Sequence, residues 1–148
     1  MKTPIKFFAL FTIGVILMAC NGQNKNENKT VDKSVSKIEV YDFHSTHRCM
    51  TCNAIEANTK YTLDTYFSNE LKTDKITFQV INVDEEQNEQ IAEQFEASGT
   101  ALILNVIKDG KETKIDLTEF AFMEGNDQDV FSKELKAKID KELKTLWF

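Results

Sequence analysis

The sequence predicts an α/β domain in which one mixed β-sheet carries helices on both faces. Segments rich in β-branched and aromatic residues alternate with segments whose apolar residues recur at helical spacing. The pair Asp109-Gly110 predicts a tight hairpin between the last two strands. The resulting order, β-α-β-α-β-β-α, combines parallel crossovers with a final antiparallel hairpin. The segment after residue 36, about 110 residues long, is sufficient for one hydrophobic core.

The first half of this domain is expected to contain two strand–helix units. Residues 38–43 form the first predicted strand, and apolar spacing predicts a helix from about residue 49 to about residue 71. Residues 76–83 form the second predicted strand. Asp84 is placed to cap the helix that follows. The buried stripe of that helix is expected to consist of Ile91, Ala92 and Phe95.

The second half is expected to contain a hairpin and a final helix. Gly99 ends the preceding helix, residues 101–107 form an apolar strand, and its hairpin partner runs through Ile115 and Leu117. The loop before the last helix is expected to contain Phe120, Phe122 and Met123. The last helix begins at about residue 127. Its apolar stripe consists of Phe131, Leu135, Ile139, Leu143 and Leu146.

The N-terminal segment has the features of an export signal. Lys2 and Lys6 precede an apolar run over residues 7–17, which is shorter than the roughly 20 residues that a membrane span requires. The run leads into residues 17–20, Leu-Met-Ala-Cys, which resemble the lipobox of bacterial lipoproteins. We therefore expect residues 1–19 to be a lipoprotein signal peptide and Cys20 to carry the lipid. An ordinary secretory signal with a chance cysteine is the alternative.

Residues 20–36 are predicted to be a lipidated cysteine followed by a flexible polar tether. The domain at residues 37–148 would then be held at a bacterial membrane, facing the periplasm, through acyl chains buried in the bilayer. Cleavage would remove Lys2 and Lys6, leaving 16 of the 18 basic residues against 24 acidic residues, a net charge of about −8. This acidic balance argues against a nucleic-acid partner.

Cys49 and Cys52 have C-x-x-C spacing, which suits a structural disulfide, a metal site or a redox couple. A disulfide that closes so short a loop adds little stability. A redox role has a physical basis, because a cysteine at a helix start is stabilised as the thiolate by the unpaired N–H groups and the helix dipole. Arg48 adds positive charge beside Cys49. Cys52, one turn further on, is placed to resolve a mixed disulfide.

Metal binding is the alternative function. His44 and His47, the only histidines in the chain, precede the cysteine pair and complete a Cys₂His₂ set for Zn²⁺, Cu(I) or As(III). His47 lies in the predicted loop and could be a ligand or a second positive group near Cys49. His44 follows directly from the strand, where a hydrogen-bonded structural role competes with a role as a ligand.

The element order and the cysteine pair after the first strand resemble the thioredoxin fold. That resemblance implies a buried acid on the strand before the motif, and Asp42 fills this place if the loop has one extra residue. A solvent-facing carboxylate is the alternative for Asp42. Thioredoxins also carry a cis-proline facing the cysteines, whereas the only proline here is Pro4. Thr100, Ala101 or Leu102 must occupy that position, so the geometry of substrate docking does not carry over.

A narrower resemblance rests on residues 40–52 and 54–56, together with 82–84 and the hairpin at 109–110. These segments are similar to a family of small exported proteins, the nitrophenyl-compound nitroreductase subunit (ArsF) family. The resemblance implies a membrane-embedded thiol–disulfide electron-transfer protein as partner and an exported protein or small molecule as substrate. No cofactor is expected, because the sequence contains neither a Gly-rich phosphate loop nor a flavin fingerprint. The expected function is therefore that of a thiol–disulfide oxidoreductase or dithiol electron carrier.

Overall fold

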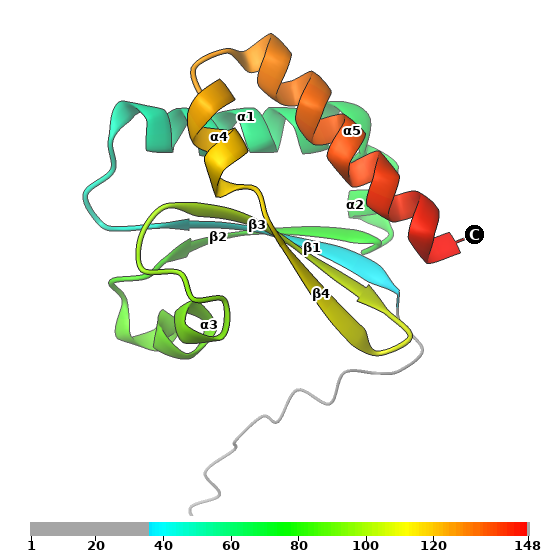
Figure 1. Ribbon diagram of the computed structural model, residues 1–148, viewed down its shortest axis with the longest axis horizontal. Coiled ribbons are helices and arrows are strands. Elements are labelled where there is room, and N and C mark those ends of the chain that lie inside the picture. The colour runs from blue at the N-terminus through cyan, green and yellow to red at the C-terminus, as the bar shows by residue number, and fades with distance from the viewer. Residues whose placement is uncertain (1–35, 148) are drawn as a thin grey trace, which may run out of the picture.

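One four-stranded mixed sheet organises the structure, a computed structural model that describes residues 36–147 (Figure 1). The predicted signal peptide, the lipidation site Cys20 and all but the last residue of the predicted tether lie outside these residues. Among the helices of residues 36–147, none has both the length and the apolar character that a membrane crossing requires.

The sheet has the strand order β2-β1-β3-β4. At its centre, β1 (Lys37–His44) pairs in parallel with β2 (Ile76–Asn82) and antiparallel with β3 (Ala101–Lys108). The edge strand β4 (Lys111–Asp116) pairs antiparallel with β3. Asp109 and Gly110 join these two strands with φ values of 51° and 75°, as a tight hairpin requires. The predicted α/β class, mixed sheet and hairpin are confirmed.

Helices cover both faces of the sheet (Figure 1). The segments α1, α4 and α5 lie over one face, whereas α3 lies over the other (Figure 1). The helical segments are α1 (Met50–Tyr66), α2 (Ser68–Lys72), the 3-10 helix η1 (Glu86–Asn88), α3 (Glu89–Gln94), α4 (Thr118–Glu124) and α5 (Gln128–Trp147).

Three expectations about the helices are wrong. Asp84 does not cap the next helix: Glu85 is the N-cap residue of η1, and the Asp84 carboxylate accepts a hydrogen bond from the Thr46 backbone N–H at 2.7 Å. The single helix predicted from about residue 49 to 71 is divided at Phe67, whose φ of −129° and ψ of 25° are not helical. Phe67 is almost fully buried, so its side chain takes a core position at this break. The loop predicted before the last helix is instead α4, and it contains Phe120, Phe122 and Met123. The backbone N–H of Thr118 donates to the Asp116 carboxylate at 2.8 Å, which caps the turn into α4.

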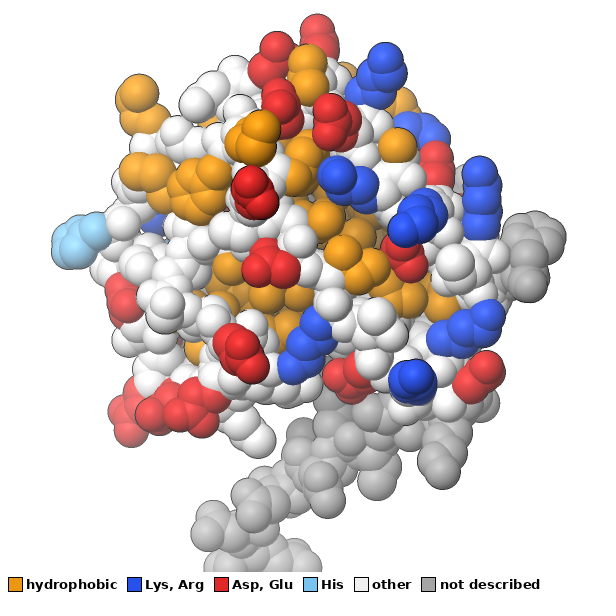
Figure 2. All heavy atoms as spheres, viewed as in Figure 1, with side chains coloured by type: hydrophobic (Ala, Val, Ile, Leu, Met, Phe, Trp, Pro, Cys, Tyr) orange, Lys and Arg blue, Asp and Glu red, His pale blue; other side chains and the backbone are white. Residues whose placement is uncertain are grey.

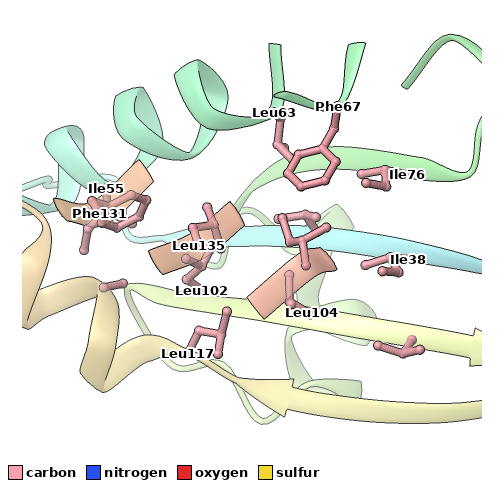
Figure 3. Close-up of a cluster of buried hydrophobic side chains, with 14 of the residues drawn as sticks. Ile38, Ile55, Leu63, Phe67, Ile76, Leu102, Leu104, Leu117, Phe131 and Leu135 are labelled. Atoms are coloured by element: carbon pink, nitrogen blue, oxygen red, sulfur yellow. The ribbon is translucent and has the colours of Figure 1, made fainter. Parts of the chain in front are cut away.

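The two faces of β1 contribute to two separate cores, because successive side chains of a strand point in opposite directions. Ile38 and Val40 belong to the larger core beneath α1 and α5. Figure 3 shows part of that core, with side chains from the helices packed over those of the strands. Tyr41 and Phe43 instead pack against Phe95 beside α3. Burial of each large apolar side chain contributes roughly 1.5–3 kcal/mol.

Candidate functional site

The cysteine pair lies where α1 begins, after the loop that follows β1. Cys49 is the N-cap of α1, with φ −76° and ψ 168°, and its sulfur accepts a hydrogen bond from the Cys52 backbone N–H at 3.1 Å. The first turn of α1 contains no acidic residue. After reduction, the helix N-terminus would therefore stabilise a thiolate at Cys49.

The two cysteines form a disulfide and differ sharply in exposure. Cys49 is exposed, whereas Cys52 is only 7% exposed. A thiol-bearing partner can therefore reach the sulfur of Cys49 but not that of Cys52. This asymmetry suits Cys49 to form a mixed disulfide and Cys52 to resolve it.

The side chain of Arg48 turns inward, beneath the start of α1. Its Nη2 donates to the Cys52 backbone carbonyl at 3.1 Å and lies 3.5 Å from Oδ2 of Asp42. Its Nη1 forms an ion pair with Glu56. The sequence interpretation placed this positive charge beside Cys49, whereas the structure gives the guanidinium two carboxylates and the Cys52 carbonyl as its contacts.

Asp42 is fully buried, so it is not a solvent-facing carboxylate. It shares the face of β1 that α1 covers, and Arg48 reaches it from the loop before α1. Burial raises the pKa of Asp42 to about 7; Arg48 opposes this shift and the negative charge of Glu56 adds to it. Oδ1 of Asp42 is buried without a hydrogen-bond partner among the described residues. A carboxyl group in this position can take up or release a proton near neutral pH.

The histidines do not join the cysteines in a metal site. Nδ1 of His44 lies 2.9 Å from the Ser45 backbone carbonyl, and His47 is exposed in the loop. Between residues 36 and 147, no three His, Cys, Asp or Glu side chains are grouped closely enough to hold a metal ion. The predicted set of His44, His47, Cys49 and Cys52 is therefore not assembled in the disulfide-bonded state.

The start of β3 is the segment for which the sequence resemblance implied a cis-proline in thioredoxins. Residues 36–147 contain no cis peptide bond, and the chain enters β3 through Thr100 and Ala101. Leu102 is hydrogen-bonded on both sides to the segment leading into α4, because its N–H donates to Thr118 Oγ1 and its carbonyl accepts from Leu117 N–H. The involvement of α4 at this end of the molecule was not predicted. The Asp116–Thr118 turn and the apolar spacing of Leu117 and Ala121 could have indicated this helix.

No protein-family model matches the chain, and no curated protein matches it. Similar solved structures include a thioredoxin from Fasciola hepatica, with 22% identity, a TM-score of 0.40, and 65% of this chain and 84% of that chain covered. They also include the thioredoxin NaTrxh from Nicotiana alata, with 24% identity, a TM-score of 0.47, and 78% and 79% covered. A third is a malarial protein, with 17% identity, a TM-score of 0.38, and 60% and 94% covered.

The sheet order, the strand directions and the helices on both faces are described directly by the structure. The cysteine pair follows the central strand and opens a helix. Together these features give the chain a thioredoxin-like α/β fold.

Proposed function

We propose that this protein is a thiol–disulfide oxidoreductase or dithiol electron carrier that acts through Cys49 and Cys52. One observation carries the proposal: an exposed cysteine at a helix N-terminus is disulfide-bonded to a buried cysteine one turn further on. A purely structural disulfide would gain little from so short a loop and has no need of an exposed sulfur. The nearby buried carboxyl of Asp42 adds a group able to exchange a proton near neutrality.

The reaction transfers two electrons and two protons. In the reduced protein, the Cys49 thiolate attacks a substrate disulfide, forming a Cys49–substrate disulfide and releasing one substrate thiolate, which takes a proton from water. Cys52, after loss of its proton, attacks the Cys49 sulfur and releases the second substrate thiol. The products are the Cys49–Cys52 disulfide and a substrate dithiol. A thiol donor regenerates the reduced pair by the reverse sequence, beginning with attack on the exposed sulfur of Cys49.

We further propose that the domain works at a membrane. The lipobox-like residues 17–20 support attachment through acylated Cys20, and the apolar run before them supports export to the periplasmic side. The thiol donor would then be a membrane-embedded thiol–disulfide electron-transfer protein, and the acceptor an exported protein or small molecule. The proposal that the chain belongs to the nitrophenyl-compound nitroreductase subunit (ArsF) family is supported by the resemblance at residues 40–52, 54–56, 82–84 and 109–110.

Trapping tests the chemistry. A Cys52→Ser variant should accumulate a mixed disulfide through Cys49, seen as a thiol-sensitive band of higher mass, and Cys49→Ser should accumulate none. The reduced wild type should consume a small disulfide such as 5,5′-dithiobis(2-nitrobenzoate) with one intramolecular disulfide formed per turnover. A thiol at Cys49 that is no more reactive than free cysteine would refute the proposal. So would a stoichiometric metal ion retained by the wild type and lost on Cys49→Ser.

Attachment has its own test. Cys20→Ala should move the protein from the membrane fraction to the soluble fraction and abolish labelling by radioactive fatty acid. The Cys49→Ser variant is the matched control, because it removes a thiol and leaves the lipobox unchanged. Fatty-acid labelling that persists in Cys20→Ala would contradict the lipoprotein assignment without affecting the redox proposal.

A further inference from the structure

The beginning of α4 is hydrogen-bonded to the start of β3, which pairs with the end of β1 that leads to the cysteine pair. The Leu102 backbone N–H donates to Thr118 Oγ1 at 3.2 Å, and the Leu117 N–H donates to the Leu102 carbonyl at 2.8 Å. These bonds fix the first turn of α4 against the start of β3. The same part of β3 follows the position of the proline that this chain lacks.

The other end of α4 packs against the first turns of α1. The Gly125 carbonyl accepts a hydrogen bond from Asn58 Nδ2 at 2.9 Å, and Asn126 Nδ2 lies 3.4 Å from Thr51 Oγ1. A side-chain Cβ at Gly125 would lie 3.0 Å from Ile55 Cγ1 and 3.2 Å from Thr51 Cγ2, so the close approach requires glycine. Because Thr51 lies between the two cysteines, α4 is held directly beside the disulfide.

Between these two anchors, α4 exposes two large apolar side chains, Phe122 and Met123, together with Glu119. Thr118, Phe122 and Asn126 fall on one i, i+4 row, and Gly125 continues the helical backbone with φ −58° and ψ −22°. Thr118 contacts β3 and Asn126 contacts α1, so Phe122 lies on the row that joins the two elements flanking the cysteines. Met123, the next residue, lies outside this row but is also exposed.

Phe122 is 43% exposed, Met123 is 70% exposed, and Met50, next to Cys49, is 88% exposed. We name these three residues the apolar rim of the site. Figure 2 shows exposed hydrophobic side chains gathered over α4 and the adjacent part of α1. Large apolar side chains left in water beside a reactive group are a common feature of a binding surface.

The charge around α4 indicates which ligand fits the apolar rim. Between Lys114 and Lys133 the chain contains no basic residue. Lys138 of α5 lies over the Phe120 ring at 4.8 Å, where Phe120 packs against Phe131. The acidic residues in this interval are Asp116, Glu119, Glu124, Asp127 and Asp129. Glu119 lies three and four positions before Phe122 and Met123, on the same side of the helix. An apolar surface with an acidic border is complementary to a ligand that is apolar and basic.

We propose that the apolar rim binds an extended segment of a partner protein in which apolar and basic residues flank the reactive cysteine. This inference rests on the proposed oxidoreductase function and names the class of protein on which Cys49 would act. Phe122 and Met123 are specificity-determining residues: they hold the partner segment across α4 while its sulfur reaches Cys49. Because Leu102 and Gly125 hold α4 in place, this surface is already ordered before a partner binds. Binding therefore loses less conformational entropy.

The test compares substrates that differ only in their flanking residues. Two peptides carry a cysteine linked to 5-thio-2-nitrobenzoate, one with Phe and Lys beside the cysteine and the other with Ser and Glu. The reduced full chain attacks the peptide sulfur, releases the coloured 5-thio-2-nitrobenzoate, and then releases the peptide thiol by Cys52 attack. We expect the Phe/Lys peptide to react about tenfold faster in kcat/KM, in line with the loss caused by truncating one aromatic contact.

Variants of the protein test which residues cause the difference in rate between the two peptides. Phe122→Ser and Met123→Ser should each reduce the ratio of the two rates by about three- to tenfold, and Glu119→Lys should reverse the part of the preference that depends on charge. Tyr61→Ser is the matched control. Tyr61 is as exposed as Phe122, at 43%, but it lies on α1 about three helical turns from Cys49. It should leave the ratio unchanged. Met123 is the more exposed of the two rim residues on α4, so its variant is expected to preserve the fold and keeps the test decisive.

Two outcomes would overturn the proposal in distinguishable ways. If the wild type reacts with both peptides at equal rates, or if the Phe122→Ser and Met123→Ser ratios equal the wild-type ratio, the apolar rim is not a docking surface although the oxidoreductase function stands. If the reduced wild type reacts with neither peptide and also fails to consume 5,5′-dithiobis(2-nitrobenzoate), the proposed function fails and the docking surface fails with it.

Discussion

Two buried carboxylates on the central strand have opposite surroundings, although only three residues separate them. Glu39 is 4% exposed on the face that α3 covers. It forms an ion pair with Lys37 at 2.7 Å and accepts hydrogen bonds from Tyr41 Oη at 2.9 Å and Asn105 Nδ2 at 3.0 Å. Asp42 is 0% exposed on the opposite face, and its Oδ2 lies 3.5 Å from Arg48. Its other oxygen has no hydrogen-bond partner in the described part of the chain.

The difference shows that burial alone does not determine the protonation state. Burial by itself would raise the pKa of Glu39, but the hydrogen bonds from Lys37, Asn105 and Tyr41 outweigh it and lower the pKa. Burial of Asp42 is opposed only by Arg48, and its pKa rises to about 7. Glu39 is therefore a permanently charged structural group. Asp42 can exchange a proton at the pH at which the cysteine pair must gain and lose one.

The largest expected effect separates the two carboxylates by activity. We expect Asp42, which is linked to Cys52 through Arg48, to accept the Cys52 thiol proton, so Asp42→Asn should lower the turnover of a small disulfide at pH 7.5 by on the order of 10²-fold. The wild-type rate should rise with pH around a midpoint near 7, as Asp42 becomes ionised, and the variant should lack that rise. Turnover assays from pH 5 to 9 measure both effects. An unchanged pH profile in Asp42→Asn would exclude Asp42 from proton transfer.

The second expected effect is on stability: removing the carboxylate of Asp42 should stabilise the folded protein at high pH. Because the folded pKa of Asp42, about 7, exceeds its ordinary value of 3.8, the folded state binds more protons between these values. Its contribution to stability is therefore greatest below pH 4 and is lost as the pH rises through 7. Asp42→Asn should raise the free energy of unfolding of the oxidised protein at pH 8 by about 2–4 kcal/mol, and by nearly nothing at pH 4. Urea titrations at the two pH values measure this, and a destabilised variant at pH 8 would contradict it.

Glu39→Gln should have the opposite consequence and a smaller one. The substitution removes charge-assisted hydrogen bonds, so the free energy of unfolding at pH 7 should fall by about 1–3 kcal/mol. Because the folded pKa of Glu39 lies below its ordinary value, its contribution is present above that value and is lost as the pH falls through the folded pKa. Turnover should remain within about twofold of the wild type. A large loss of turnover in a folded Glu39→Gln variant would show that the two carboxylates are coupled through β1.

The sequence predicted the features of this site that depend on local order along the chain. The β-branched and aromatic residues predicted β1, the Asp109-Gly110 pair predicted the hairpin, and apolar residues at helical spacing predicted the helix that begins at the cysteine pair. These features arise from backbone preferences of neighbouring residues, so a single sequence contains them. The break at Phe67 was missed because burial of an aromatic side chain in the core, a tertiary contact, overrode a helical pattern that continues to Leu71.

The parts of the site that depend on side-chain direction were not predictable in the same way. Position in the sequence placed Arg48 next to Cys49, but its long side chain reaches Asp42, Glu56 and the Cys52 carbonyl instead. The segment that forms α4 was predicted to be a loop because seven residues are too few to show a clear apolar period. The helix is instead stabilised by contacts with Leu102 and Thr51, which are distant from it in the sequence. Tertiary contacts therefore determine both the direction of the Arg48 side chain and the formation of α4.

The smallest expected effect tests whether the Arg48 side chain acts on Asp42 or on Cys49. Arg48→Gln removes the only positive charge that opposes the burial of Asp42, so the pH midpoint of turnover should rise by about one unit. Turnover at pH 6 should then fall by up to about tenfold and recover above pH 8. Arg48→Lys is the matched control: it retains the charge but loses the guanidinium fork, so its midpoint should lie between those of the wild type and Arg48→Gln. If Arg48 acted mainly on Cys49, as its position in the sequence suggests, Arg48→Gln would instead raise the pH at which iodoacetamide alkylates reduced Cys49 and leave the Asp42-dependent midpoint unchanged.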